Sequence, residues 1–223
     1  MKAALKYLAG IAGPSGYGSN STADQVTEHC FCPPHLLTAI ITGATSGIGA
    51  ETARVLAKKG VRIIIAARNL SKGAEVKEAI LKEAPHAQII ILEIDLSSMA
   101  SVSRFCSEFL SLDLPLNILI NNAGVFSQKL EFSEDKIELT MATNYFDSLY
   151  FLAAKLLKTT SQGAATTCYV ALCPETEGVS GKYFADCNQT CCSALAADHS
   201  QALRLWKHTR TLICRRLQHP SLS

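Results

Sequence analysis

The chain has 223 residues, of which 48% are hydrophobic and 18% charged, enough for one globular domain with a substantial core. This composition excludes an intrinsically disordered chain and a collagen-like repeat. Lysine and arginine number 21 against 19 aspartates and glutamates, giving a net charge of +2. That balance does not provide the basic surface typical of duplex DNA binding, so nucleic acid is not an expected partner.

The nine cysteines show no CxxC spacing, so the sequence assigns no zinc site, redox pair or disulfide framework, and a reducing compartment fits best. His199, His208 and His219 are nine and eleven positions apart, which makes no metal-binding face on a helix, and no metal is expected. Lys2 and Lys6 interrupt the apolar start of the chain. Because a spanning helix needs about 20 apolar residues, no transmembrane segment is expected there.

Short β-branched runs alternate with longer stretches of helical periodicity, which is the pattern of a parallel sheet covered on both faces. The predicted strands span residues 36–42, 61–67, 88–94 and 117–121. The predicted helices span residues 47–59, 73–83, 98–110 and 134–158, and a further amphipathic, basic helix spans 202–217. The fold class predicted is therefore α/β, a Rossmann-like doubly wound parallel sheet.

The first strand-to-helix turn carries Gly43, Gly47 and Gly49 in the run Thr-Gly-Ala-Thr-Ser-Gly-Ile-Gly. Glycines at such a turn permit a tight bend, close approach of a pyrophosphate and close helix packing, and the following helix N-terminus attracts anions. The spacing is GxxxGxG and differs from the general GxGxxG fingerprint. The glycines alone are therefore a weak indication of dinucleotide binding.

Two more motifs follow later predicted strands: Asp95-Leu96 after the third, and Asn121-Asn122-Ala123-Gly124 after the fourth. Together with the glycine turn they resemble the short-chain dehydrogenase/reductase family, over about residues 36–154. The resemblance implies that the glycine turn holds a pyrophosphate, that Asp95 and Leu96 face an adenine, and that the last motif supports the cofactor.

The end of the second predicted strand indicates which dinucleotide is bound. It reads Ala-Ala-Arg-Asn, with Arg68 and Asn69 where NAD-selective folds place a carboxylate on the ribose 2′-hydroxyl. A guanidinium suits a 2′-phosphate instead, so NADP(H) is the predicted cofactor. The expected cofactor-binding residues are Gly43, Ser46, Gly47, Ile48, Gly49, Arg68, Asn69, Asp95, Leu96, Asn122, Ala123 and Gly124.

The resemblance also implies a catalytic Tyr, a Lys four positions later on the same helix face and a Ser on the preceding strand. None of the six tyrosines is followed by Lys at that spacing. Tyr150 and Lys155 are five positions apart, which turns their side chains roughly 140° from each other. Asn144 is the only member of the family's catalytic set that the sequence retains.

Residues 163–172 and 178–187 resemble the C-terminal end of family members, although they follow the 134–158 helix directly. The comparison implies that the region from strand five to strand six, roughly eighty residues, is absent. The chain then forms a single domain, with an N-terminal extension (1–35), a cofactor-binding half (36–160) and a C-terminal remnant (161–223). The loss exposes the edge of the fourth strand, and one hypothesis is that residues 182–186 add a strand there.

The opening segment 7–23 and the run GKYFADCN resemble plant short-chain dehydrogenases related to retinol dehydrogenases, including one associated with the chloroplast inner-envelope translocon. This resemblance implies a peripheral location at that envelope, and otherwise the expected location is cytoplasmic. The basic helix at 202–217 would bind calmodulin or a translocon partner, or alternatively pack on its own sheet. The predicted function is an NADP-dependent oxidoreductase impaired in catalysis; the alternatives are a non-catalytic NADP(H) sensor or scaffold, and a non-functional splice product.

Overall fold

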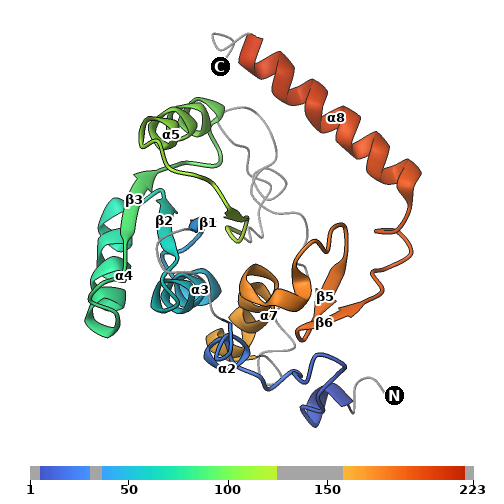
Figure 1. Ribbon diagram of the computed structural model, residues 1–223. Helices are drawn as coiled ribbons and strands as arrows, with labels where there is room; N and C mark the ends of the chain where they lie inside the picture. The colour runs from blue at the N-terminus through green and yellow to red at the C-terminus, as the bar shows by residue number, and fades with distance from the viewer. Residues whose placement is uncertain (1–5, 31–36, 125–157, 219–223) are drawn as a thin grey trace.

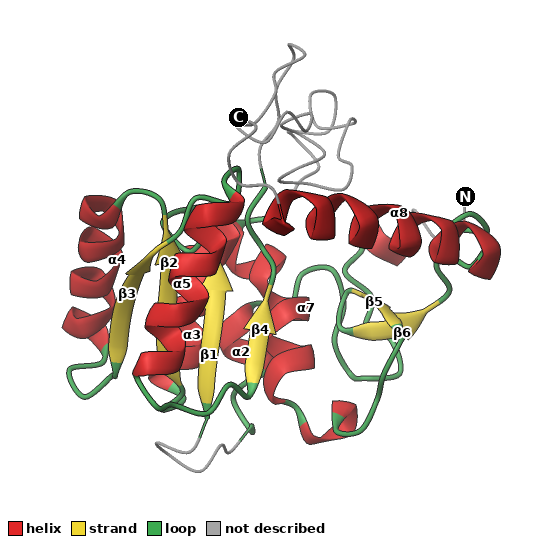
Figure 2. Ribbon diagram, turned by 90° about the horizontal axis from the view of Figure 1, so that it is seen from above, coloured by secondary structure: helices red, strands yellow, loops and turns green. Residues whose placement is uncertain are grey.

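The computed structural model describes residues 6–30, 37–124 and 158–218. Its centre is a sheet of four parallel strands in the order β3-β2-β1-β4 (Figure 2). These strands are β1 (Thr38–Thr42), β2 (Arg62–Ala67), β3 (Ile89–Glu93) and β4 (Ile118–Ile120). Their order and parallel pairing confirm the predicted Rossmann-like class, and each strand lies within its predicted range.

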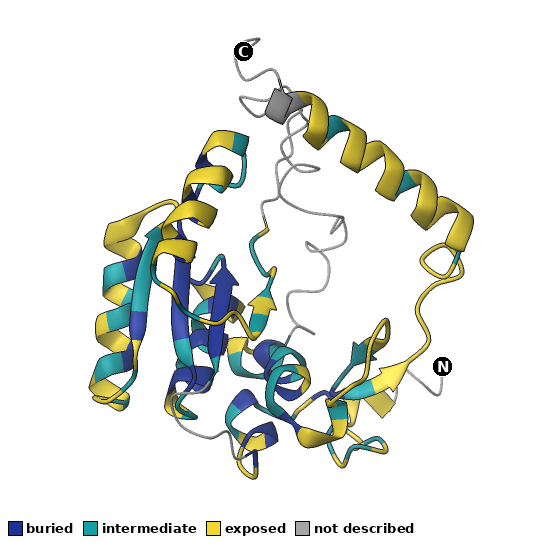
Figure 3. Ribbon diagram, turned by 45° about the horizontal axis from the view of Figure 1, so that its top comes forward, coloured by how far each residue is buried: buried dark blue, intermediate teal, exposed yellow. Residues whose placement is uncertain are grey.

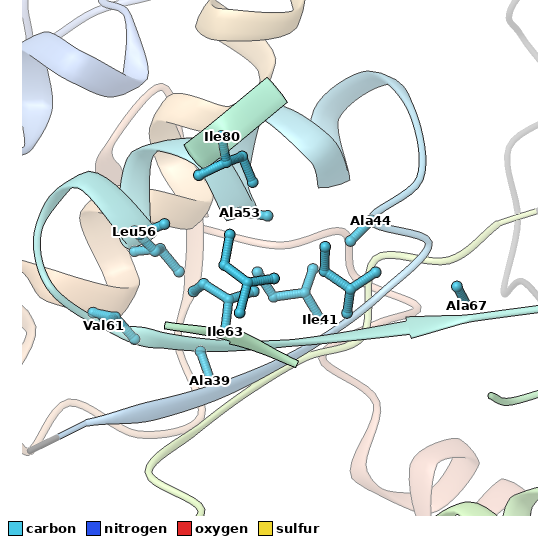
Figure 4. Packing of buried hydrophobic residues seen from close by; sticks show 12 residues of the cluster. Ala39, Ile41, Ala44, Ala53, Leu56, Val61, Ile63, Ala67 and Ile80 are labelled. Carbon is cyan, nitrogen blue, oxygen red and sulfur yellow. The ribbon is translucent and has the colours of Figure 1, made fainter. Parts of the chain in front are cut away.

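Three helices connect these strands and form layers on both faces of the sheet: α3 (Gly47–Lys58), α4 (Leu70–Glu83) and α5 (Met99–Ser111). Successive strand residues alternate between the two faces. Ile41 and Ile63 pack with Leu56 of α3 in one buried cluster (Figure 4). Ile40 and Ile64 point the other way and pack in a second cluster that includes the α5 aromatic side chains. The central strands are therefore buried on both faces, as their continuous apolar runs predict.

Two departures of the helix boundaries from the prediction lie next to the cleft end of the sheet or in the predicted long helix. Helix α4 begins at Leu70, earlier than expected, because the Asn69 side chain accepts a hydrogen bond from the Lys72 N–H at 3.0 Å and caps the helix. The helix expected at 134–158 lies outside the described residues except for Lys158. That residue is not helical; it precedes α7 (Thr160–Leu172), so the predicted end of the long helix is wrong.

Helix α7 packs on α3 and on the short helix α2 (Ala23–Val26), so segments from the N-terminal and C-terminal parts of the chain lie side by side next to the sheet (Figure 1). Val55 of α3, Val26 of α2 and Ala164 of α7 are buried in one shared cluster. The N-terminal extension and the C-terminal segment thus form a second layer outside α3.

The hypothesis that residues 182–186 pair with the edge of β4 is wrong. Strand β5 (Tyr183–Ala185) pairs instead with β6 (Asn188–Thr190) in an antiparallel hairpin. Its two turn residues, Asp186 and Cys187, both have positive φ (51° and 63°), as a primed two-residue turn requires, so the pairing closes locally. Within the described part of the chain, β4 is the last strand on its side of the sheet.

Helix α8 (His199–Gln218) extends the predicted C-terminal helix by a few residues and stands apart from the sheet (Figures 1 and 3). Its side chains are mostly exposed, including Trp206 at 66%. The expectation that this helix packs on its own sheet is therefore wrong. The helix contains five cations and no acidic residue, and none of the ion pairs found among the described residues involves it. Among those residues, no helix combines the length and apolar character required to cross a bilayer.

Arg54 connects three helices by ion pairs. Its guanidinium contacts Glu51 on α3 at 2.7 Å, Glu83 on α4 at 3.0 Å and Asp24 on α2. The hydrogen bond from Arg54 lowers the pKa of Glu51, although partial burial opposes the shift. Burial also raises the pKa of Asp24, but hydrogen bonds from Arg54 and Lys58 outweigh it and leave that pKa lowered.

Folded-state pKa values below the unfolded ones predict a specific pH dependence. The stabilisation is present above the unfolded carboxyl pKa of about 4 and is lost as the pH falls through the folded pKa. We expect the free energy of unfolding, measured by urea denaturation, to decrease between about pH 5 and pH 3. Arg54→Gln should flatten this dependence, whereas Arg104→Gln, which removes an exposed 3.9 Å pair with Glu93, should not. An unchanged profile in Arg54→Gln would contradict this account.

Candidate functional site

A cleft of about 650 Å³ opens at the carboxyl ends of β1, β2 and β4, where open α/β sheets bind ligands. It brings together the predicted cofactor-binding residues with the exception of Asn69, which is not part of its lining. Asn144 lies outside the described residues. The predicted residues that line the cleft are Gly43, Ser46, Gly47, Ile48, Gly49, Arg68, Asp95, Leu96, Asn122, Ala123 and Gly124.

The three glycines of the turn are needed for different reasons. Gly43 has a φ of +65°, and a Cβ there would lie 2.7 Å from the Ala123 Cα. Gly47 also has a positive φ, +55°, but a Cβ would meet open space. At Gly49 a Cβ would lie 2.4 Å from both the Asn122 Nδ2 and the Gly43 carbonyl oxygen. Two of the glycines therefore permit close packing of the turn on the end of β4, and two permit the backbone conformation.

Asn122 and Thr42 hold the ends of β4 and β1 together. The Asn122 Nδ2 donates hydrogen bonds to the carbonyl oxygens of Thr42 at 3.1 Å and Gly43 at 3.3 Å. The Thr42 Oγ1 accepts from the backbone N–H groups of Asn122 at 3.1 Å and Ala123 at 3.0 Å. The sequence reasoning missed Thr42; a hydroxyl at the last position of the strand, before the glycine turn, was the available signal.

Helix α3 begins at the cleft with its first N–H groups uncapped by a side chain. Ser46 occupies the N-cap position but makes no capping hydrogen bond. The first N–H groups of a helix lack intrahelical acceptors and carry the positive end of the helix dipole. This end of α3, next to Gly47, can therefore hold a phosphate group.

The second and third strands supply a cationic and an anionic side chain to the same cleft. Arg68 is exposed at the end of β2, and no acidic residue stands beside it in the run 66–69. The Asp95 Oδ1 accepts hydrogen bonds from the Ser97 hydroxyl at 2.6 Å and the Ser97 N–H at 2.9 Å. These bonds lower the pKa of Asp95, burial opposes them, and the positive charge of Arg68 adds to the lowering. Asp95 is thus ionised near neutral pH.

The residues just before and at the start of α7, Lys158, Thr159 and Thr160, also line the cleft, which sequence reasoning did not anticipate. Thr159 caps α7: its Oγ1 accepts from the Gln162 N–H at 3.2 Å, and the Gln162 side chain accepts from the Thr159 N–H at 2.9 Å. Lys158 forms an ion pair with Asp186 of the β5–β6 turn. The Thr-x-x-Gln capping box is a readable signal for a helix beginning at Thr160.

Comparison with known proteins identifies the family. A family model described as short chain dehydrogenase matches residues 37–167, more than half of the chain. The protein belongs to the short-chain dehydrogenase family. Its family is therefore one of oxidoreductases, and the resemblance seen in the three strand-end motifs is confirmed.

Individual relatives show how the chain differs from the family. The short-chain dehydrogenase TIC 32 B, chloroplastic, of Brassica napus is 35% identical over 314 residues, covering 92% of this chain and 97% of the relative. Retinol dehydrogenase 12 of Bos taurus is 39% identical over 118 residues, covering 53% of this chain and 37% of the relative. A metagenomic short-chain oxidoreductase solved with NADP is 33% identical, covering 41% of each chain at a TM-score of 0.39.

The comparison with TIC 32 B shows how many positions of that relative this chain lacks. Its 314 aligned positions exceed the 223 residues of this chain, so at least 91 positions of the relative have no counterpart here. The comparison covers 97% of the relative, so this chain is shorter than the relative within the aligned region. That the missing positions are the region from strand five to strand six stays a prediction.

The contact between Gly49 and Asn122 yields a stability prediction. Gly49→Ala should lower the free energy of unfolding by about 2 to 3 kcal/mol, because the new methyl group would displace the Asn122 side chain or the Gly43 carbonyl. In Gly47→Ala the new methyl group would contact no neighbouring atom. The free energy of unfolding should therefore fall by only about 1 kcal/mol, because alanine is strained at a positive φ. Urea denaturation of both variants checks the order, and equal losses would contradict the close packing described for Gly49.

Proposed function

We propose that this protein is an NADP(H)-binding short-chain dehydrogenase that does not itself reduce carbonyl compounds and that acts as a cofactor sensor or scaffold. One observation carries the proposal: the cleft is assembled at the strand ends, while the sequence contains no Tyr followed four positions later by Lys. The chain therefore keeps the residues expected to bind the cofactor but lacks the Tyr and Lys expected to catalyse carbonyl reduction.

The residues of the cleft fit the parts of NADP(H). The glycine turn and the N-terminus of α3 would hold the pyrophosphate, with Ser46 and Ile48 beside it. The exposed Arg68 guanidinium would pair with the 2′-phosphate, which a neighbouring carboxylate would have repelled. When bound, the cofactor would supply hydride chemistry: NADPH donates a hydride from its nicotinamide ring, and NADP+ accepts one. Ionised Asp95 with Leu96 would line the adenine side, and residues 122–124 would support the cofactor from β4.

Asn69 does not line the cleft, but it lies next to Arg68, the residue proposed to bind the 2′-phosphate. By capping α4 it fixes the backbone that follows Arg68, so its proposed role is to position that residue. Asn144 is proposed as the one retained member of the catalytic set.

Carbonyl reduction requires an acid that donates a proton to the carbonyl oxygen. The family resemblance implies that a Tyr plays this role and that a nearby Lys lowers the pKa of that Tyr. Tyr169 has the opposite environment: it is buried against Tyr17 and Phe184, and its burial raises its pKa. Burial likewise raises the pKa of Tyr17. Neither side chain lines the cleft, so neither can replace the missing acid.

Location and partners extend the proposal. The two Brassica napus relatives are named as chloroplastic, which favours a chloroplast location, and we place the protein peripherally at the inner envelope. Helix α8 is proposed to dock a partner, calmodulin or a translocon component, because it exposes Trp206 and the cations Arg204, Lys207, Arg210 and Arg215 without packing on the sheet. The proposed division of the single domain is residues 1–35 as extension, 36–160 as the cofactor half and 161–223 as the remnant.

Cofactor selectivity tests the binding half of the proposal. Arg68→Gln should weaken NADPH binding about 10- to 100-fold, the loss of one charge-assisted contact, and leave NADH binding within about 3-fold. Arg62→Gln is the matched control, because that arginine lies at the opposite end of β2 and bonds to Gln88. Fluorescence titration with both cofactors measures the affinities. An equal effect of Arg68→Gln on NADPH and NADH would refute its assignment to the 2′-phosphate.

Turnover tests the catalytic half. With NADPH and a panel of aldehydes and ketones, the purified protein should oxidise NADPH no faster than the uncatalysed background, because no Tyr in the sequence has a Lys four positions later to lower its pKa. The assay follows the absorbance of NADPH in parallel with a titration that shows the cofactor is bound. Carbonyl-dependent turnover well above background would overturn this part of the proposal.

A further inference from the structure

Four of the cysteines are buried together between the N-terminal extension and helix α7. Cys30, Cys168, Cys173 and Cys187 belong to the cluster that also contains Val26, Val55 and Tyr169. Cys30 follows α2, Cys173 caps the C-terminus of α7, and Cys187 is in the turn of the β5–β6 hairpin. The proposed cofactor role uses none of these thiols.

Two of these four cysteines have their sulfur atoms in close contact. The Sγ atoms of Cys30 and Cys173 are 2.8 Å apart, although 143 positions separate the residues in the sequence. Both sulfurs also approach the Val26 carbonyl oxygen, at 3.5 Å from Cys30 and 3.3 Å from Cys173. A disulfide bond is about 2.05 Å long, so the two sulfurs need to approach by less than about 1 Å. Both segments are already fixed in place by their packing on α3 and α7.

We propose that Cys30 and Cys173 form a reversible disulfide that links the N-terminal extension to the C-terminal segment. The bond encloses the whole four-stranded sheet in one covalent loop. It fastens α2 to α7 at the surface where these helices cover α3. This modification site is independent of the cofactor proposal, because neither residue lines the cleft.

Thiol–disulfide exchange with an external disulfide, such as oxidised glutathione, makes the bond. One cysteine thiolate attacks a glutathione sulfur, forming a mixed disulfide and releasing one glutathione thiolate. The second cysteine thiolate then attacks the protein sulfur of the mixed disulfide, which forms the Cys30–Cys173 bond and expels the second glutathione thiolate. The protein thiols lose two electrons and two protons in total, and the external disulfide becomes two thiols.

The environment of the pair sets the conditions for this reaction. Burial raises the pKa of the Cys173 thiol, and the neighbouring Cys30 raises it further. Because the thiolate is the nucleophile, oxidation should be slow near neutral pH and faster as the pH rises. Burial also raises the pKa of Cys168, to about 12, but among the described residues no other sulfur approaches that thiol as closely as Cys30 approaches Cys173.

Peptide mapping of the full-length chain tests the proposal. The reduced, folded protein is equilibrated with oxidised glutathione at pH 8, trapped with acid, alkylated and digested with chymotrypsin. Cleavage after Phe31 separates Cys30 from Cys32, and cleavage after Tyr169 and Leu172 separates Cys168 from Cys173. The expected product is the Cys30–Cys173 peptide pair, which dithiothreitol removes. The same treatment in guanidinium chloride should give mixed pairings.

Thermal unfolding provides a second measurement. Oxidation should raise the unfolding midpoint of the wild-type chain by roughly 5 to 15 °C, and dithiothreitol should reverse the rise. Cys173→Ser should abolish this oxidation-dependent shift, whereas Cys168→Ser, a buried thiol on the same helix, should retain it. Pairing of Cys173 with Cys187 or Cys32, or pairing confined to the exposed cysteines, would overturn the proposal. If Cys173→Ser does not fold, the wild-type peptide map alone decides the outcome.

Discussion

The close packing of the Asn122 side chain on the glycine turn is the contact on which the architecture depends. Its amide donates to the carbonyls of Thr42 and Gly43, so the ends of β1 and β4 are joined through side-chain hydrogen bonds beyond the sheet ladder. The absence of a side chain at Gly49 makes room for that amide. As a result the N-terminus of α3 is held at the mouth of the cleft, where an anionic group can bind.

The rest of the described chain forms an additional layer beside a short sheet. Chloroplastic relatives of this family have at least 91 aligned positions that are absent here, and β4 is the last strand on its side in the described part of the chain. Helix α7 and the N-terminal α2 cover α3, and the β5–β6 hairpin attaches to α7 where the Cys187 N–H donates to the Thr166 hydroxyl at 3.1 Å. A covalent link at Cys30 and Cys173 would strengthen this outer layer.

Sequence reasoning succeeded where the signal is local and repeated. Buried parallel strands require continuous apolar runs, so residues 62–67 and 89–93 could be placed from the sequence, and the glycine turn followed from its position between strand and helix. It placed the start of α4 too late because the Asn69 cap was overlooked. It misplaced residues 182–186 because the hairpin turn uses Asp186 and Cys187 at positive φ, and cysteine gives no turn signal. The proximity of Cys30 and Cys173 depends on tertiary packing, which no local pattern encodes.

The central claim is that the shortened chain still folds its cofactor half and binds NADP(H) there. Amide hydrogen exchange followed by mass spectrometry, with and without saturating NADPH, tests it most directly. The account predicts strong protection of β1 and β2 in the free protein, with added protection at residues 43–49 and 122–124 when NADPH is present. Saturating NADH should add much less protection at these residues than NADPH does. Rapid exchange throughout β1 and β2, or a protected sheet whose exchange NADPH does not change, would contradict the account.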